Sequence, residues 1–269
     1  MDRYLQANAR LWDNWTMLHA TSDYYDVAGF KAGKSTLTPI ELDGLGDVSG
    51  KSLLHLQCHF GLDTLSWARR GARVTGVDFS GRAIEQARSL AAELRIAARF
   101  IQSNVYDLPA ALHEAFDIVF TSYGVLSWLP DLHRWAEVVA HFLAPAGIFF
   151  IVDHHPFASI FGSADGGELW RRVAVPYFPG PQPEVTESYG SYAVSSDERQ
   201  GIEYNWRHPL SEIINAVLAA GLHLESLHEY PYSDFPVKPG MECGEDGWWR
   251  LPGKGDGMIP LLFSLKATK

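Results

Sequence analysis

Two apolar runs, residues 53–61 and 74–80, constrain the fold of this chain more than any other feature. The first predicts a buried strand that ends in a turn and opens a helix. The second predicts a buried strand whose last residue is Asp78. An open α/β sheet forms a nucleoside site in this way, because the turn admits the ligand and the carboxylate holds the ribose hydroxyls. The two runs therefore predict both a ligand and its place.

The segments around these runs alternate between strand and helix patterns. Several strand patterns are apolar on both faces, as is typical of parallel strands covered by helices. Alternating units of this kind predict a doubly wound, mostly parallel sheet. The expected strands are 52–57, 73–77, 98–102, 116–121 and 147–152, and the expected helices are 62–70, 81–94 and 131–143.

The alternation breaks after residue 156, where Pro, Gly, Tyr and Ser become frequent. We therefore expect an inserted cap over residues 157–208, with a hairpin that pairs 189–194 with 201–206. Residues 1–45 are expected to form an N-terminal helical lid, and residues 46–156 the cofactor-binding core. Residues 209–269 should complete the sheet with a helix at 210–220 and strands at 222–230 and 259–267.

Composition narrows the classes of partner. The chain of 269 residues has a net charge of −10 and no extended basic cluster, which disfavours nucleic acid as a partner. No apolar run approaches the roughly 20 residues of a membrane span. The N-terminus lacks a signal pattern, and two cysteines make no disulfide framework, so we expect a cytoplasmic protein. Aromatic residues make up 13% of the chain, which favours a pocket for a small organic molecule.

Two other phosphate-binding patterns do not fit. A dinucleotide fingerprint needs three spaced glycines in the first turn, and here only Gly61 is present. The run Lys31-Ala32-Gly33-Lys34-Ser35 is similar to a P-loop, but Gly29 is one residue too close and no buried strand precedes it.

The remaining pattern resembles the class I S-adenosylmethionine-dependent methyltransferases. The resemblance runs from about residue 50 to 155 and is carried by residues 54–61, 77–80, 100–109, 116–131 and 143–147. It implies a seven-stranded Rossmann-like sheet and S-adenosylmethionine as cofactor. The chain departs from the family pattern at four positions: His55 replaces the acid of the first strand, Gln57 and His59 replace glycines, and Asn104 replaces the adenine-contacting acid.

Carried over position by position, the resemblance implies a set of cofactor contacts. The methionine part would lie against Gln57, Cys58 and Gly61, the ribose hydroxyls against Asp78, and the adenine against Phe79, Asn104 and Val105, with Thr121 or Ser122 below the sulfonium. Each position also has a structural interpretation. Asp78 could be a helix N-terminal charge, Phe79 core packing, Asn104 a turn former and Cys58 a small buried residue.

Methyl transfer to a neutral acceptor needs a base near the strand ends. His154 and His155 directly follow the fifth strand and are the leading candidates, with one of them possible as a packed turn residue. His59 is a second candidate, or a contact to the methionine carboxylate. Two adjacent histidines rarely bind one ion, so we expect no metal site. The expected acceptor pocket is aromatic and comprises Tyr123, Trp128, Trp170, Tyr177 and Trp206.

The sequence thus predicts methyl transfer to a small organic acceptor. A binding protein without transfer, or an enzyme that holds S-adenosylhomocysteine during other chemistry, stays open because the first turn is altered. A protein or RNA methyltransferase is a third option, against which the acidic charge and the segment Thr121-Ser122-Tyr123-Gly124 argue. The oligomeric state is also open, with a homodimer as one option.

Overall fold

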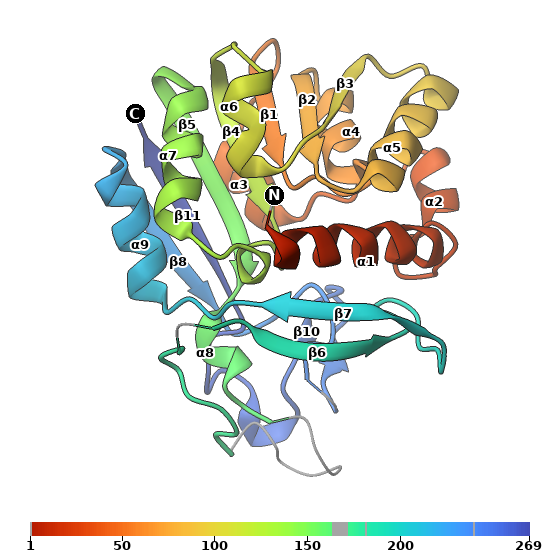
Figure 1. Ribbon diagram of the computed structural model, residues 1–269, viewed down its shortest axis with the longest axis vertical. Coiled ribbons are helices and arrows are strands. Elements are labelled where there is room, and N and C mark those ends of the chain that lie inside the picture. The colour runs from red at the N-terminus through yellow and green to blue at the C-terminus, as the bar shows by residue number, and fades with distance from the viewer. Residues whose placement is uncertain (1, 163–171, 181, 239) are drawn as a thin grey trace.

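A seven-stranded sheet forms the centre of the computed structural model, which describes residues 2–162, 172–180, 182–238 and 240–269. The strand order is β3-β2-β1-β4-β5-β11-β8, and β11 runs in the direction opposite to the other six strands (Figure 1). This confirms the doubly wound sheet. The strands are β1 (Ser52–Leu56), β2 (Arg73–Asp78), β3 (Ala98–Gln102), β4 (Phe116–Ser122), β5 (Leu143–His154), β8 (His223–Tyr230) and β11 (Leu262–Thr268).

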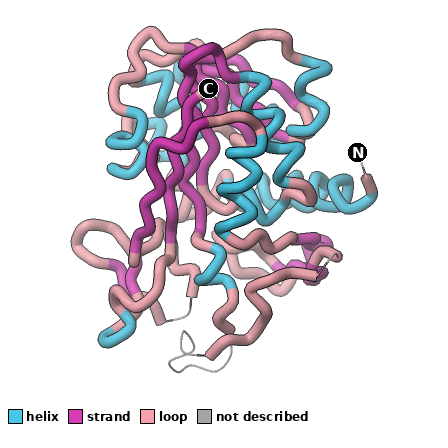
Figure 2. Tube along the Cα trace, turned by 90° about the vertical axis from the view of Figure 1, so that its left-hand side faces the viewer, coloured by secondary structure: helices cyan, strands magenta, loops and turns pink. Residues whose placement is uncertain are grey.

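Helices cover both faces of the sheet (Figure 2). Side chains alternate along each strand, so Leu54 and Leu56 pack on one face and Leu53 on the other. The first face packs against α6 (Leu108–Ala111), α7 (Leu132–Phe142) and α9 (Leu210–Ala219), where Trp135 is fully buried. The second face packs against α3 (Pro39–Leu45), α4 (Leu62–Arg69) and α5 (Gly81–Leu94), whose apolar side chains share clusters with those of the strands.

The N-terminal segment is helical, with α1 (Arg3–His19) and α2 (Val27–Lys31) before α3. In Figure 1, α1 crosses the edge of the sheet at which the parallel strands end. A hairpin of β6 (Glu184–Tyr189) and β7 (Arg199–Asn205) lies along α1. Asn8 is fully buried between them, and its side-chain amide donates to Tyr204 O at 2.8 Å and accepts from Tyr204 N at 2.9 Å. Helix α1 and the hairpin therefore form one layer over the strand ends.

Three expected strand boundaries are wrong, and one of them is the last strand, which begins at Leu262 rather than at 259. The first hairpin strand covers 184–189 rather than 189–194, because Gly190 takes a left-handed backbone (φ 65°) that ends the strand. Strand β5 begins at Leu143 rather than at 147, and α7 ends at Phe142. Leu143 already pairs with Phe116, and the register then shifts before Ile148 pairs with Ile118.

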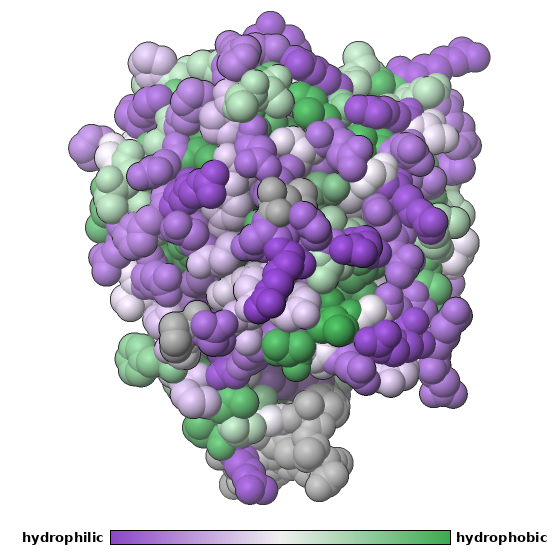
Figure 3. All heavy atoms as spheres, viewed as in Figure 1, coloured by the Kyte–Doolittle hydropathy of each residue, from purple (hydrophilic) through white to green (hydrophobic). Residues whose placement is uncertain are grey.

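Shorter elements complete the chain. They are η1 (Val105–Asp107), η2 (Leu126–Trp128), α8 (Pro156–Ser159), β9 (Glu242–Cys243), β10 (Trp249–Arg250) and η4 (Gly253–Gly255). Hydrophilic side chains predominate on the face seen in Figure 3, with apolar ones interspersed among them in both its upper and lower parts. Within the described residues, no helix combines the length and apolar character needed to cross a membrane.

Candidate functional site

The turn after β1 has positive φ angles, the conformation that glycine adopts most readily, at two positions that are not glycine. Gln57, His59 and Gly61 all have positive φ, at 57°, 51° and 79°. L-residues rarely adopt this conformation because it costs roughly 1–2 kcal/mol. Gln57 and His59 stand where the family pattern has glycines, and both still have the positive φ typical of glycine. The turn therefore gains two side chains but has a backbone that glycine would also adopt.

Asp78, at the end of β2, fastens this turn. Its Oδ2 accepts from His59 N at 2.8 Å, and its Oδ1 accepts from Ser80 N at 2.9 Å. The side chain is buried, and burial raises the pKa of Asp78 to about 6, although the two backbone N–H groups act in the opposite direction. The carboxylate thus joins the turn after β1 to the start of α5.

Helix α1 supplies an aromatic wall over the turn. The rings of Trp12 and His19 both lie 5.1 Å from the ring of His59, measured between centroids, and Tyr25 lies 5.3 Å from it. Burial lowers the pKa of His19 to about 3, and burial with the neighbouring His19 lowers that of His59 well below its ordinary value. Both imidazoles are therefore neutral near pH 7.

Three buried polar atoms around this turn have no hydrogen-bond partner among the described residues. They are Trp12 Nε1, His19 Nε2 and Gln57 Oε1. The other end of the Gln57 amide donates to Val125 O at 3.1 Å, which fixes its orientation. Unpaired buried polar atoms are uncommon in proteins, so their grouping here indicates a place for a polar ligand.

The remaining predicted cofactor residues lie beside the same strand ends, several of them with internal partners. Asn104 Oδ1 accepts from Tyr106 N at 3.2 Å and so caps η1, as a turn former does. Val105 is buried in the core, and Phe79 is half-buried. Cys58 is buried, and burial raises the pKa of its thiol well above the ordinary range, which is unfavourable for a nucleophile.

The predicted positions below the sulfonium both have internal partners, one in the sheet and one in α4. Thr121 Oγ1 donates to Leu56 O at 3.0 Å, and Ser122 Oγ donates to Asp63 Oδ2 at 3.0 Å. Ser122 also lies 3.5 Å from His55 Nε2. The histidine that replaces the acid of β1 therefore belongs to a buried polar network beneath the turn.

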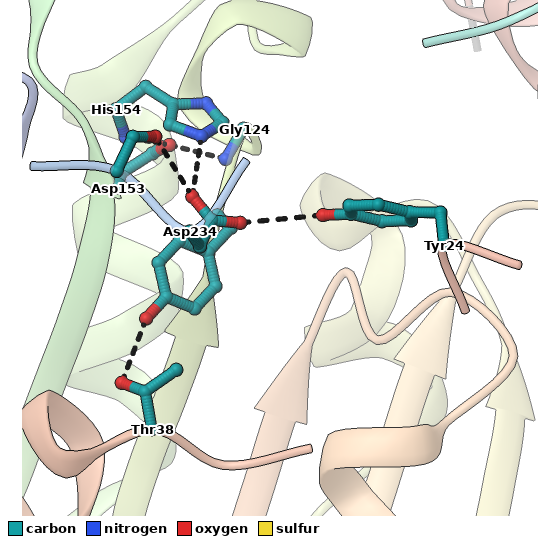
Figure 4. A network of polar contacts seen from close by, with 8 residues as sticks. Tyr24, Thr38, Gly124, Asp153, His154 and Asp234 are labelled. Atoms are coloured by element: carbon teal, nitrogen blue, oxygen red, sulfur yellow. Dashed lines mark hydrogen bonds and ion pairs between the residues drawn. The ribbon is translucent and has the colours of Figure 1, made fainter. Parts of the chain in front are cut away.

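The two candidate bases have different surroundings. His155 is 4% exposed, its Nδ1 accepts from Phe157 N at 3.1 Å, and its Nε2 lies 2.8 Å from Glu229 Oε1. His154 is 30% exposed, and its Nε2 lies 3.1 Å from Asp234 Oδ1 (Figure 4). Burial lowers the pKa of His154, but the hydrogen bond and charge of Asp234 outweigh burial and raise it above the ordinary value. Of the two, His154 is the more exposed to solvent.

Asp234 was not identified from the sequence. It lies after β8, and its Oδ2 accepts from Tyr24 Oη at 3.4 Å, so it connects the N-terminal segment with β5 (Figure 4). Asp153, beside His154, accepts from the backbone N–H groups of Gly124, Leu126 and His154. Because Asp234 follows no motif and meets His154 only in the fold, sequence spacing gave no signal for it.

A cavity of about 420 Å³ opens beside His154. Among the predicted pocket residues, Trp206 lines it, and Tyr123 lies near His154 with its ring centroid 6.3 Å away. Trp128 instead packs against Trp12 of the aromatic wall, at 5.3 Å between centroids. Tyr177 lies apart, where its hydroxyl accepts from Leu210 N, and Trp170 falls outside the described residues. Of the predicted pocket residues that the structure describes, Trp206 and Tyr123 therefore lie near His154, whereas Trp128 and Tyr177 lie elsewhere.

Comparison with known proteins agrees with this geometry. Residues 53–147 match the profile of a family described as "Methyltransferase domain". A ubiquinone biosynthesis O-methyltransferase of Alkalilimnicola ehrlichii is 31% identical over 148 residues, which cover 53% of this chain and 60% of that relative. The match therefore spans less than two thirds of the relative's length.

Solved structures share the fold at lower identity. An S-adenosylmethionine-dependent methyltransferase from Mesorhizobium loti aligns with a TM-score of 0.57 and 18% identity, over 89% of this chain and 100% of that one. The [4+2]-cyclase SpnF aligns with a TM-score of 0.53 and 15% identity, over 86% of this chain and 78% of that one. The two proteins carry different activities on one architecture.

Two glycines with similar backbones test how tightly the turn is packed. A Cβ at Gly61 would lie 2.6 Å from Phe100 Cε1, whereas one at Gly50 (φ 72°) would meet nothing within 4 Å. Both alanine variants bear a left-handed backbone cost of roughly 1–2 kcal/mol. Gly61→Ala should lose about 1–3 kcal/mol more in free energy of unfolding through overpacking, measured by urea denaturation. Equal losses in the two variants would contradict the tight packing.

Proposed function

We propose that the protein transfers a methyl group from S-adenosylmethionine to a small organic acceptor, because residues 53–147 match a methyltransferase family and the sheet has the matching fold. The observation that carries the proposal is the turn after β1, with its positive φ angles and its link to Asp78. A relative named for O-methylation of a small molecule supports the acceptor class. The cytoplasmic location, the absence of a nucleic-acid partner and the homodimer stay predictions.

The residues around the turn fit the methionine end of the cofactor. That end carries a carboxylate and an ammonium group. Trp12 Nε1 is a buried donor suited to the carboxylate, and Gln57 Oε1 is a buried acceptor suited to the ammonium. Bound here, S-adenosylmethionine would supply the methyl group of its sulfonium: the acceptor atom would bond to the methyl carbon as the carbon–sulfur bond breaks, with S-adenosylhomocysteine as the leaving group.

Asp78 fits the ribose hydroxyls. A carboxylate offers about four lone-pair positions, and the N–H groups of His59 and Ser80 use one on each oxygen. A free position on each oxygen can accept from one of the two hydroxyls. This role requires the ionised form, because a protonated carboxyl loses acceptor capacity.

Because the ribose contact needs the ionised carboxylate of Asp78, we expect the affinity for the cofactor to depend on pH. Since its pKa is raised to about 6, the carboxylate is ionised above that pH and protonated below it. Affinity for S-adenosylhomocysteine, measured by calorimetry, should fall about tenfold between pH 7 and pH 5. Asp78→Asn should bind at least tenfold more weakly at pH 7 and lose this dependence. A variant with wild-type affinity would rule out the ribose contact.

His154 is suited to take the proton that a neutral acceptor releases. Its Nδ1 side lies near Gly124, and its Nε2 is held by Asp234, so the ring has a defined orientation. Only the neutral imidazole accepts a proton. Asp234 acts through His154 and is a positioning residue, while the aromatic wall excludes water from the sulfonium.

Substitutions at this pair should separate catalysis from binding. His154→Gln should lower kcat by about 10²–10⁴ while affinity for S-adenosylhomocysteine is kept. The wild-type rate should rise with pH through a pKa above 6.5, and Asp234→Asn should move that rise to lower pH, because the partner that raises the pKa is gone. His113→Gln, an exposed position, serves as the control. Unchanged kcat in His154→Gln would remove it as the base.

A second candidate function is binding of the cofactor without methyl transfer. The cyclase SpnF has the same fold, and Gln57 and His59 replace glycines of the family pattern here. Methyl-labelled S-adenosylmethionine incubated with the protein and a cell extract distinguishes the two. We expect label in molecules below a few kDa, and none with Asp78→Ala. Label in macromolecules alone would favour a protein or RNA methyltransferase, and no label would favour the non-transferring function.

A further inference from the structure

The cavity of about 420 Å³ beside His154 has a mixed wall. It lies where β5 ends, between the end of β7 and the segment 235–238. Trp206, Ile213 and Phe235 contribute apolar surface, which suits the body of an organic molecule. Its ionisable wall residues indicate what charge such a molecule can carry.

All but one of the ionisable side chains at this wall have partners that offset their charge. Asp153 accepts from three backbone N–H groups, and His154 faces Asp234. The other pairs are His155 with Glu229, Arg207 with Glu184, and His208 with Glu212.

Lys238 differs from these residues. Its Nζ donates to the backbone oxygen of Phe161 at 2.6 Å, and no carboxylate of the described residues forms an ion pair with it. A lysine ammonium has three donors, so two stay available. Burial without a compensating charge lowers the pKa of Lys238 below its ordinary value. An anion in the cavity would provide that charge.

We propose that the acceptor carries an anionic group, a carboxylate or a phosphate monoester, and that Lys238 binds it. This rests on the proposed function, since it names the class of acceptor for the same site. The group would lie at the Lys238 end of the cavity, with the organic body on Trp206 and Phe235 and the reacting atom toward His154. Because the chain has a net charge of −10, a cation that lacks an ion pair among the described residues would give this wall its selectivity for anions.

Four small probes of similar shape and different charge test the proposal: benzoate, phenyl phosphate, benzamide and benzylamine. Their binding to the full chain, saturated with S-adenosylhomocysteine, is measured by calorimetry. Wild-type protein should prefer at least one anion to benzamide by about tenfold, the effect of one charge-assisted hydrogen bond. Whether benzoate or phenyl phosphate binds more tightly identifies the anion.

Substitutions assign the preference to Lys238. Lys238→Met should abolish it and Lys238→Arg should keep it, whereas Lys31→Met, at an exposed pair with Glu93, should have no effect. Thermal unfolding and affinity for S-adenosylhomocysteine should stay at wild-type values in Lys238→Met. The proposal is overturned if no anion is preferred, including the case that no probe binds, or if Lys238→Met keeps the preference. If the wild-type protein does not bind S-adenosylhomocysteine, that result would instead refute the proposed function.

Discussion

The hydrogen bonds of the Asp78 carboxylate underlie the whole site. One oxygen holds the turn after β1 and the other holds the start of α5, so a single side chain sets the spacing between two neighbouring strand ends. Asp13 of α1 accepts from Ser80 Oγ at 2.7 Å and from Arg82 N at 3.0 Å, which docks the N-terminal helix next to the same carboxylate. The turn, the helix start and the aromatic wall therefore depend on one another.

A second carboxylate, Asp153, has a comparable role on the acceptor side. It fixes the loop after β4 by accepting from the backbone of Gly124 and Leu126, while the adjacent His154 faces the cavity. Each half of the site is thus held by a buried acid at the end of a parallel strand. Such acids can receive several backbone N–H groups there because loop residues leave those donors unpaired.

The sequence was sufficient for the sheet and for the place of Asp78 at the end of β2, because these depend on local patterns and on short spacings. The sequence also located the altered turn, but it did not reveal that Gln57 and His59 have positive φ. Trp12, Asp234 and Lys238 could not be found in this way. Each acts through contacts with segments far along the chain, and an isolated Trp, Asp or Lys carries no spacing that marks such a contact.

The pairing of Asn8 with Tyr204 joins residues 196 positions apart. Helix α1 is synthesised first, but the strand that it needs for its buried amide is made only after the sheet core from β1 to β5. Contacts of such long range form late in folding, because ordering the intervening chain comes first. We therefore expect the strand ends that carry the turn and Asp78 to form before α1 and the hairpin cover them.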